Sequence, residues 1–127
     1  MKPRESLVRL KTFQAKEKRR QRDQLAAMID EFQRMGADLD VQIEAEERRA
    51  GITDPTHFAY PMPAKAARTR RDNLEVSARE LKVQLDAANI ALEEAEAELA
   101  KAEAKDRRDG RAPVAEPEPV RQSAMIG

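Results

Sequence analysis

The sequence of 127 residues has no cysteine and no tryptophan, and aromatic residues make up only 3% of it. Without cysteine the chain has no disulfide framework and no thiolate site, which fits a reducing compartment. With so few large apolar side chains it cannot fill the thick core of a globular enzyme. A chain of this length forms one domain at most.

Long apolar runs are also missing. No stretch approaches the roughly 20 apolar residues of a membrane-spanning helix. Lys2 and Arg4 could begin a signal peptide, but no apolar segment follows them. We therefore expect a soluble, cytoplasmic protein.

Charge of one sign is not in excess, because 24 basic residues balance 24 acidic ones. A non-specific nucleic-acid binder is usually basic overall, so we expect no nucleic-acid partner. Ala, Glu, Lys, Leu and Arg dominate, as they do in long helices and coiled coils.

Helix-breaking residues cluster in one central stretch, 51–63, which holds Gly51 and the prolines Pro55, Pro61 and Pro63. On either side lie segments of matched length, about 4–50 and 64–109, that end at Gly51 and at Gly110. We predict an all-α domain over 1–109, a long antiparallel two-helix coiled-coil hairpin with its tip at 51–63. The proline-containing segment 110–127 is expected to be a disordered C-terminal tail.

Heptad patterns support this fold. In the second segment, steps of four and three residues give a regular seam, the line of residues expected to face the other helix. Its members are Leu74, Ala78, Leu81, Leu85, Ala88, Leu92, Ala95, Leu99 and Ala102. In the first segment we predict the seam at Leu25, Met28, Phe32, Met35 and Leu39, with Ile43 one position out of phase.

The charge distribution favours antiparallel pairing. Residues 1–24 hold nine basic and three acidic side chains, whereas residues 86–109 hold eight acidic and four basic ones. A hairpin in which paired residue numbers add up to about 113 brings these blocks together. It also brings the acidic residues before the tip close to the basic ones after it, which selects orientation more than it adds stability.

In this pairing, the seam residues Leu92, Ala95 and Leu99 face the polar residues Gln21, Lys18 and Gln14 of the first segment. Either the stems of Lys18 and nearby glutamines cover the leucines, or the open end of the hairpin is held by another protein. The second alternative makes candidate partner-binding residues of the two leucines and the basic run Lys16, Lys18, Arg19, Arg20 and Arg22. An acidic protein is the expected partner.

The tip has more detail than a bare loop. Asp54 and Pro55 suit a helix N-cap and first turn, so we predict a short helical turn over 55–60. Its apolar residues either fold back over the helix ends or form a second contact site that includes Phe58 and Tyr60. His57 is the only histidine, so one chain offers no histidine-based triad or multi-histidine metal site. We expect no catalysis, metal or cofactor.

Two stretches resemble a known family. Residues 4–14, followed by Glu-Lys-Arg-Arg at 17–20, are similar to the opening of flagellar export proteins of the FliJ type. The block Glu-Glu-Arg-Arg-Ala-Gly-Ile-Thr-Asp-Pro-Thr-His-Phe-Ala-Tyr-Pro at 46–61 resembles the alphaproteobacterial branch. The resemblance covers roughly residues 4–106.

This resemblance implies a non-enzymatic component of the flagellar type III export apparatus at the cytoplasmic face of the inner membrane. Its implied partners are the export ATPase hexamer, the export gate protein and export chaperones, with membrane association only through these partners. The alternative is a structural coiled coil that associates with itself through the leucine stripe.

Overall fold

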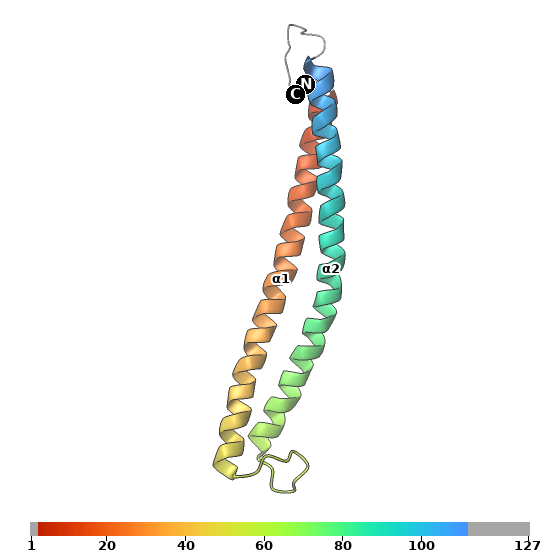
Figure 1. The fold of residues 1–127 in the computed structure, drawn as a ribbon. Helices are drawn as coiled ribbons and strands as arrows, with labels where there is room; N and C mark the ends of the chain where they lie inside the picture. Colours follow the sequence, from red (N-terminus) through yellow and green to blue (C-terminus); the bar gives the residue numbers. More distant parts are fainter. Residues whose placement is uncertain (1–2, 112–127) are drawn as a thin grey trace. The chain divides into compact units, whose positions relative to one another are not determined.

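The computed structural model describes residues 3–111, and within them it contains two helices and no strand. Helix α1 spans Pro3–Ala50 and helix α2 spans Met62–Arg111. The chain reverses between them, so the predicted all-α antiparallel hairpin is confirmed (Figure 1). The predicted tail lies outside the described residues, apart from the last turn of α2.

Sequence signals explain most of the helix ends. Gly51 has a φ of 72°, the left-handed conformation that glycine adopts without steric cost. Its N–H donates to the carbonyl of Glu47 at 2.8 Å, which closes α1. Pro63 lies in the first turn of α2, where a missing N–H does no harm. The predicted stop at Gly110 is wrong, because the helix continues through it to Arg111.

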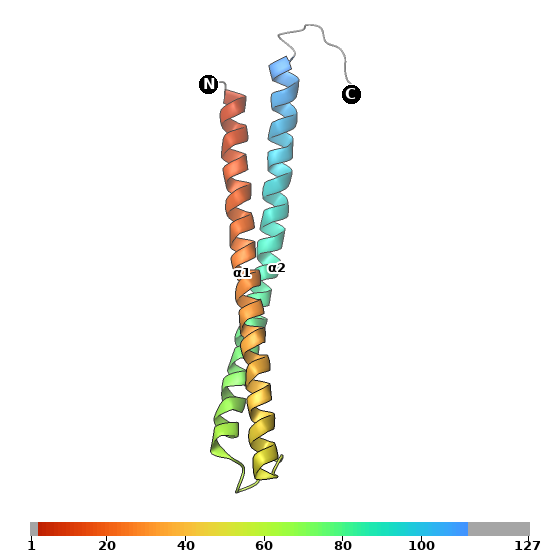
Figure 2. The same ribbon diagram turned by 90° about the vertical axis from the view of Figure 1, so that its left-hand side faces the viewer.

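The described chain forms two compact units, each containing a part of both helices. The terminal unit comprises α1 up to Arg20 and α2 from Asn89, and the tip unit comprises residues 21–88. Within each unit the two helices lie side by side in opposite directions (Figures 1 and 2).

The seam of α1 differs from the predicted one. Ile29 is buried at 8% exposure and Ile43 at 4%, and Gly36 is buried between them. Met28 and Met35, which we placed in the seam, are exposed at 45% and 42%. Half-buried residues complete the same heptad phase in the tip unit: Arg22, Leu25, Phe32 and Leu39. The prediction for the two methionines was wrong, and Ile43 is in phase with the seam.

The seam of α2 follows the prediction. All nine predicted positions are buried or half-buried, and the same spacing continues toward the tip through Ala64, Ala67 and Arg71. Ala64 and Ala67 have no exposed surface. Alanine at these positions lets the helices approach closely next to the tip, because it has no side chain beyond Cβ to hold them apart.

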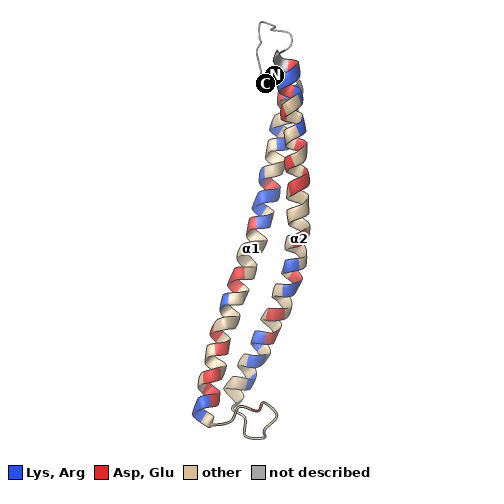
Figure 3. Cartoon of the chain, viewed as in Figure 1, with Lys and Arg blue, Asp and Glu red and all other residues tan. Residues whose placement is uncertain are grey.

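Ion pairs between the helices agree with the predicted charge pattern. In the terminal unit, Arg4 pairs with Asp109 at 3.0 Å and Lys11 with Glu98 at 3.8 Å, so basic α1 lies against acidic α2 (Figure 3). The first of these pairs matches the predicted register directly. In the tip unit, Arg68 lies 3.7 Å from Glu47, as expected for the residues flanking the tip.

Candidate interaction surfaces

The basic run is divided between two environments. Lys16, Arg19 and Arg20 are exposed, whereas Lys18 and Arg22 are half-buried. Arg19 reaches across to Glu96 at 2.5 Å, and Arg20 pairs with Glu17 on its own helix at 2.8 Å. The hydrogen bond from Arg20 lowers the pKa of Glu17, so this carboxylate stays ionised beside it. These two ion pairs therefore neutralise part of the positive charge that the basic run exposes.

The leucine stripe is not open. Leu92 is only 5% exposed, Leu99 is half-buried and Ala102 is buried. On α1 of the same unit, the positions that complete the seam are Val8, Lys11, Ala15 and Lys18, all half-buried or buried. Their placement favours the first alternative from the sequence, in which the aliphatic stems of lysines help to cover the leucines while their ammonium groups reach water.

This burial corrects the partner-binding role that we assigned to Leu92. A residue with 5% exposure cannot contact a partner unless the helices separate. Leu99 is half-buried in the same seam. Self-association of the chain, the alternative function that we drew from the sequence, stays a prediction.

Two exposed apolar side chains of the terminal unit lie together on α1 instead. Phe13 is 62% exposed and Leu10 is 50% exposed, on the side of α1 that faces away from its seam. Phe13 precedes Arg20 by seven residues, so the two side chains lie on one helical face, with Lys16 between them. Sequence reasoning missed this surface because it looked for contact sites only in the leucine stripe, the basic run and the tip, and Phe13 belongs to none of them. The observed seam, extended back to Val8, leaves Phe13 outside.

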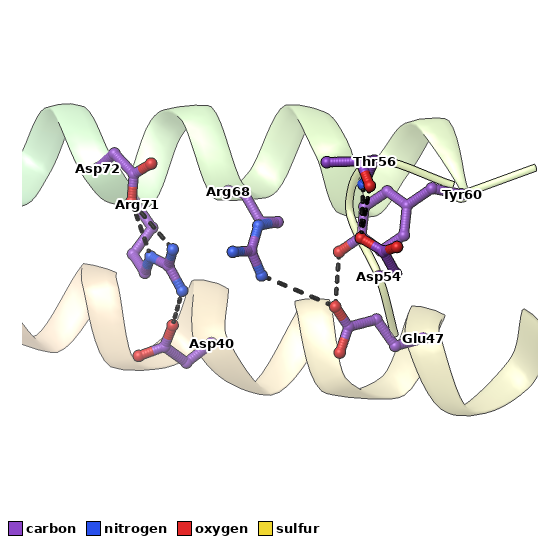
Figure 4. A network of polar contacts seen from close by, with 8 residues as sticks. All are labelled: Asp40, Glu47, Asp54, Thr56, Tyr60, Arg68, Arg71 and Asp72. Carbon is purple, nitrogen blue, oxygen red and sulfur yellow. Dashed lines mark hydrogen bonds and ion pairs between the residues drawn. The ribbon is translucent and has the colours of Figure 1, made fainter. Parts of the chain in front are cut away.

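At the tip, Tyr60 folds back onto α1. It is 6% exposed, and its hydroxyl donates to Glu47 Oε2 at 2.6 Å (Figure 4). Burial, with the nearby carboxylate as a smaller cause, raises the pKa of Tyr60. Arg68 lies on the other side of the same carboxylate. Tyr60 is therefore a structural residue, which corrects its assignment to a partner-binding site.

A second polar cluster connects the helices further along the tip unit. Arg71 donates to Asp40 Oδ1 at 3.0 Å and to Asp72 Oδ1 at 2.9 Å (Figure 4). These hydrogen bonds raise the pKa of the Arg71 guanidinium. Arg71 occupies a seam position, so the aliphatic part of its side chain packs between the helices. Its guanidinium group lies at the edge of the seam, where the two carboxylates accept its hydrogen bonds.

The loop itself contains turns and no helix. Asp54 Oδ1 accepts from the Thr56 N–H at 2.9 Å, and this bond lowers the pKa of Asp54. The backbone then turns twice, from His57 to Asp54 and from Tyr60 to His57. The predicted helical turn over 55–60 is therefore wrong, although Asp54 does cap the backbone locally.

His57 shapes the loop, and Phe58 is left on its surface. The Ala59 N–H donates to His57 Nδ1 at 2.9 Å, and the imidazole stacks on Phe58 with ring centroids 4.8 Å apart. Phe58 is 96% exposed. Of the two tip residues assigned to partner binding, only Phe58 is accessible.

Within residues 3–111, no group of three or more potential ligands is placed to hold a metal ion. Neither α1 nor α2 is apolar over enough of its length to cross a bilayer. Searches of protein-family models, of curated proteins and of solved structures found no match to the chain.

Proposed function

We propose that this chain is a non-enzymatic component of the flagellar protein export apparatus, which binds the export ATPase ring and promotes its activity. The proposal includes a link from the ring to the export gate or to export chaperones. It rests on the resemblance of residues 4–20 and 46–61 to the FliJ family, together with the helical hairpin. The hairpin alone is unspecific, because many proteins share it.

The observation that carries the binding role is the outward face of α1 in the terminal unit. Lys16 and Arg20 are exposed there beside Phe13 and Leu10, whereas Arg19 lies at the edge of this face, where it pairs with Glu96 of α2. Exposed aromatic and arginine side chains are typical anchors of protein interfaces. A basic surface with an aromatic centre suits an acidic protein partner, whose charges would speed the encounter.

Binding of variants to the purified export ATPase tests this assignment. Substituting Phe13→Gln with Lys16→Glu should weaken binding by at least about tenfold, since an aromatic anchor and a favourable charge are both lost. Val41→Gln with Arg34→Glu is the matched control, because both residues are exposed on α1 in the tip unit. Equal binding by the two double variants would contradict the assignment of this face.

A salt titration separates this surface from an apolar one. Binding that depends on exposed charges should weaken as ionic strength rises. If binding persists unchanged in high salt while the Phe13→Gln variant still fails to bind, the basic residues have no part in recognition.

A further inference from the structure

Helix α2 has a second heptad line in the tip unit, on the side opposite its seam. Steps of four and three residues mark out positions that are all exposed: Met62, Ala66, Thr69, Asn73, Val76, Glu80, Val83 and Ala87. Met62 is 73% exposed and Val83 is 70% exposed. Only Glu80 carries a charge. We call these eight residues the outer seam.

The equivalent positions of α1 look like an ordinary solvent-facing surface. They are Gln24, Ala27, Glu31, Arg34, Asp38, Val41, Ala45 and Arg48, and half of them are charged. The two helices share the same unit and similar overall composition. The low charge of the outer seam is therefore particular to that face of α2, and it has the spacing that a further helix would pack against.

Charged residues follow one edge of the outer seam at intervals of seven. Lys65, Asp72, Arg79 and Asp86 alternate in sign, and all four are exposed. Asp72 pairs with its neighbour Arg71 at 2.9 Å. Within residues 3–111, the other three form no ion pair, so their charges are available to a partner.

This alternation makes the face complementary to itself. Consider a second α2 that runs antiparallel to the first, with the two-fold axis at Val76. Lys65 of one copy then lies beside Asp86 of the other copy, and Asp72 of one copy lies beside Arg79 of the other copy. The symmetry repeats both pairs, so all four charges are matched. A surface built for an unrelated helix has no need of such a pattern.

The residues inside the outer seam fit the same register. Val76 meets its own copy and Thr69 lies level with Val83, while Asn73 and Ala66 lie within one residue of the levels of Glu80 and Ala87. Glu80 is the only charge in the line, and it faces an amide that can donate a hydrogen bond to it. No layer places two like charges together.

A parallel pairing lacks this complementarity. Flanking positions of parallel helices meet five residues apart, which brings Lys65 close to Arg70 of the second copy. Asp72 then faces Ser77, and Arg79 faces Gln84. Two of these contacts are neutral and one is repulsive, so the charge pattern selects the antiparallel arrangement.

We propose that two copies of this chain associate through the outer seam of α2, antiparallel, about a two-fold axis at Val76. The inference goes beyond the proposed function and does not use the basic face of the terminal unit. Two valines and small residues bury little area, so the dissociation constant is expected on the order of 100 µM. The contact acts where copies are held at high local concentration.

Single-cysteine variants test the axis directly, because the natural chain has no cysteine that could interfere. Oxidation of Val76→Cys should produce a disulfide-linked dimer at least about tenfold faster than oxidation of Val41→Cys, which lies on α1 with similar exposure to Val83. Val83→Cys should oxidise as slowly as the Val41→Cys control, because in this register residue 83 of one copy lies about 21 Å along the helix from residue 83 of the other copy. Circular dichroism checks that each variant is folded.

Two outcomes would overturn the proposal. Slow oxidation of Val76→Cys, no faster than the Val41→Cys control, would show that copies do not meet there. Equally fast oxidation of Val83→Cys would indicate a parallel or unregistered contact. Neither result bears on ATPase binding, so failure here is distinguishable from failure of the proposed function.

A charge exchange tests the register independently, using sedimentation equilibrium at up to millimolar concentration. Lys65→Glu and Asp86→Lys should each weaken self-association by about tenfold, because two attractive pairs become repulsive. An equimolar mixture of the two variants should recover association. In the mixed dimer, the two introduced side chains attract each other on one side of the axis, and the unchanged Lys65 and Asp86 pair on the other. A mixture that associates no better than either variant alone would contradict the register.

Discussion

The Tyr60 hydroxyl donates a 2.6 Å hydrogen bond to Glu47 Oε2, across thirteen residues of sequence, and this bond attaches the tip loop to the last turns of α1. Arg68 of α2 lies against the same carboxylate. One acidic side chain therefore holds the loop and both helices of the tip unit together. The exposed pair of Arg48 with Glu44, by contrast, joins only consecutive turns of one helix.

The first prediction concerns the ionisation of Tyr60. It is the only tyrosine and the chain has no tryptophan, so ultraviolet absorbance reports on its phenolate alone. Because burial and Glu47 disfavour the phenolate, its pKa should lie above the ordinary value of about 10. Because the pKa of Tyr60 is higher in the folded chain than in the unfolded chain, its protonated hydroxyl adds to the free energy of unfolding. This contribution is complete at any pH below the pKa of Tyr60 in the unfolded chain. It is lost as the pH rises through the pKa of Tyr60 in the folded chain.

The matched variant for this titration is Glu47→Gln. It keeps an acceptor for the hydroxyl but removes the negative charge, so the pKa of Tyr60 should fall below that of the natural chain while burial still holds it above its unfolded value. An identical titration curve in the two proteins would mean that Glu47 does not act on Tyr60.

The second prediction compares two glycines. Gly51 has a positive φ, so Gly51→Ala should lower the free energy of unfolding by about 1 kcal/mol. Gly36 lies inside α1, and a Cβ built there meets nothing within 4 Å. Gly36→Ala should therefore raise the same free energy by roughly 0.5–1 kcal/mol. Urea unfolding followed by circular dichroism measures the free energy of unfolding of both variants. If the two substitutions changed it equally and in the same direction, the different backbone conformations of the two glycines would be contradicted.

The third prediction tests the seam of α1 with two adjacent residues. Ile29→Asp places a charge in the seam and should cost about 2–4 kcal/mol of unfolding free energy. Met28→Asp changes a residue that is 45% exposed and should cost less than about 1 kcal/mol. The seam that we predicted from the sequence requires the reverse order, so the same pair of urea titrations decides between the two phases.

The fourth prediction concerns Leu92. Because it is buried, Leu92→Gln should destabilise the chain by about 2–3 kcal/mol through loss of apolar burial and desolvation of the amide. Ile90→Gln is the control, since Ile90 is 58% exposed two residues earlier. Should Leu92→Gln unfold at the same urea concentration as the control, Leu92 is open to a partner after all.

The sequence predicted α2 better than α1 for a physical reason. In α2, leucine or alanine fills all nine predicted seam positions, so hydrophobic spacing identifies the seam. In α1, Met28 competes with Ile29, and the seam includes Gly36 and the basic residue Lys18, which hydrophobicity does not mark. The phase of Ile43 was the available clue, because it agrees with Ile29 and not with Met28.

The interaction surfaces were harder to predict, because exposure depends on that phase. Of the residues that we assigned to partner binding, Lys16 and Arg19 are exposed, whereas Tyr60 and Leu92 are packed. Tyr60 illustrates the difficulty. An aromatic residue in a loop contacts either a partner or its own chain, and here the position of Glu47 on the last turns of α1 decides for the second.

The most direct measurement of the central claim is the ATP hydrolysis rate of the purified export ATPase as this chain is added. The account predicts co-purification of the two proteins and a rate that rises and then saturates, with the Phe13→Gln, Lys16→Glu variant requiring higher concentrations than the Val41→Gln, Arg34→Glu control. Neither co-purification nor any change in rate, with the chain shown to be folded by circular dichroism, would contradict it.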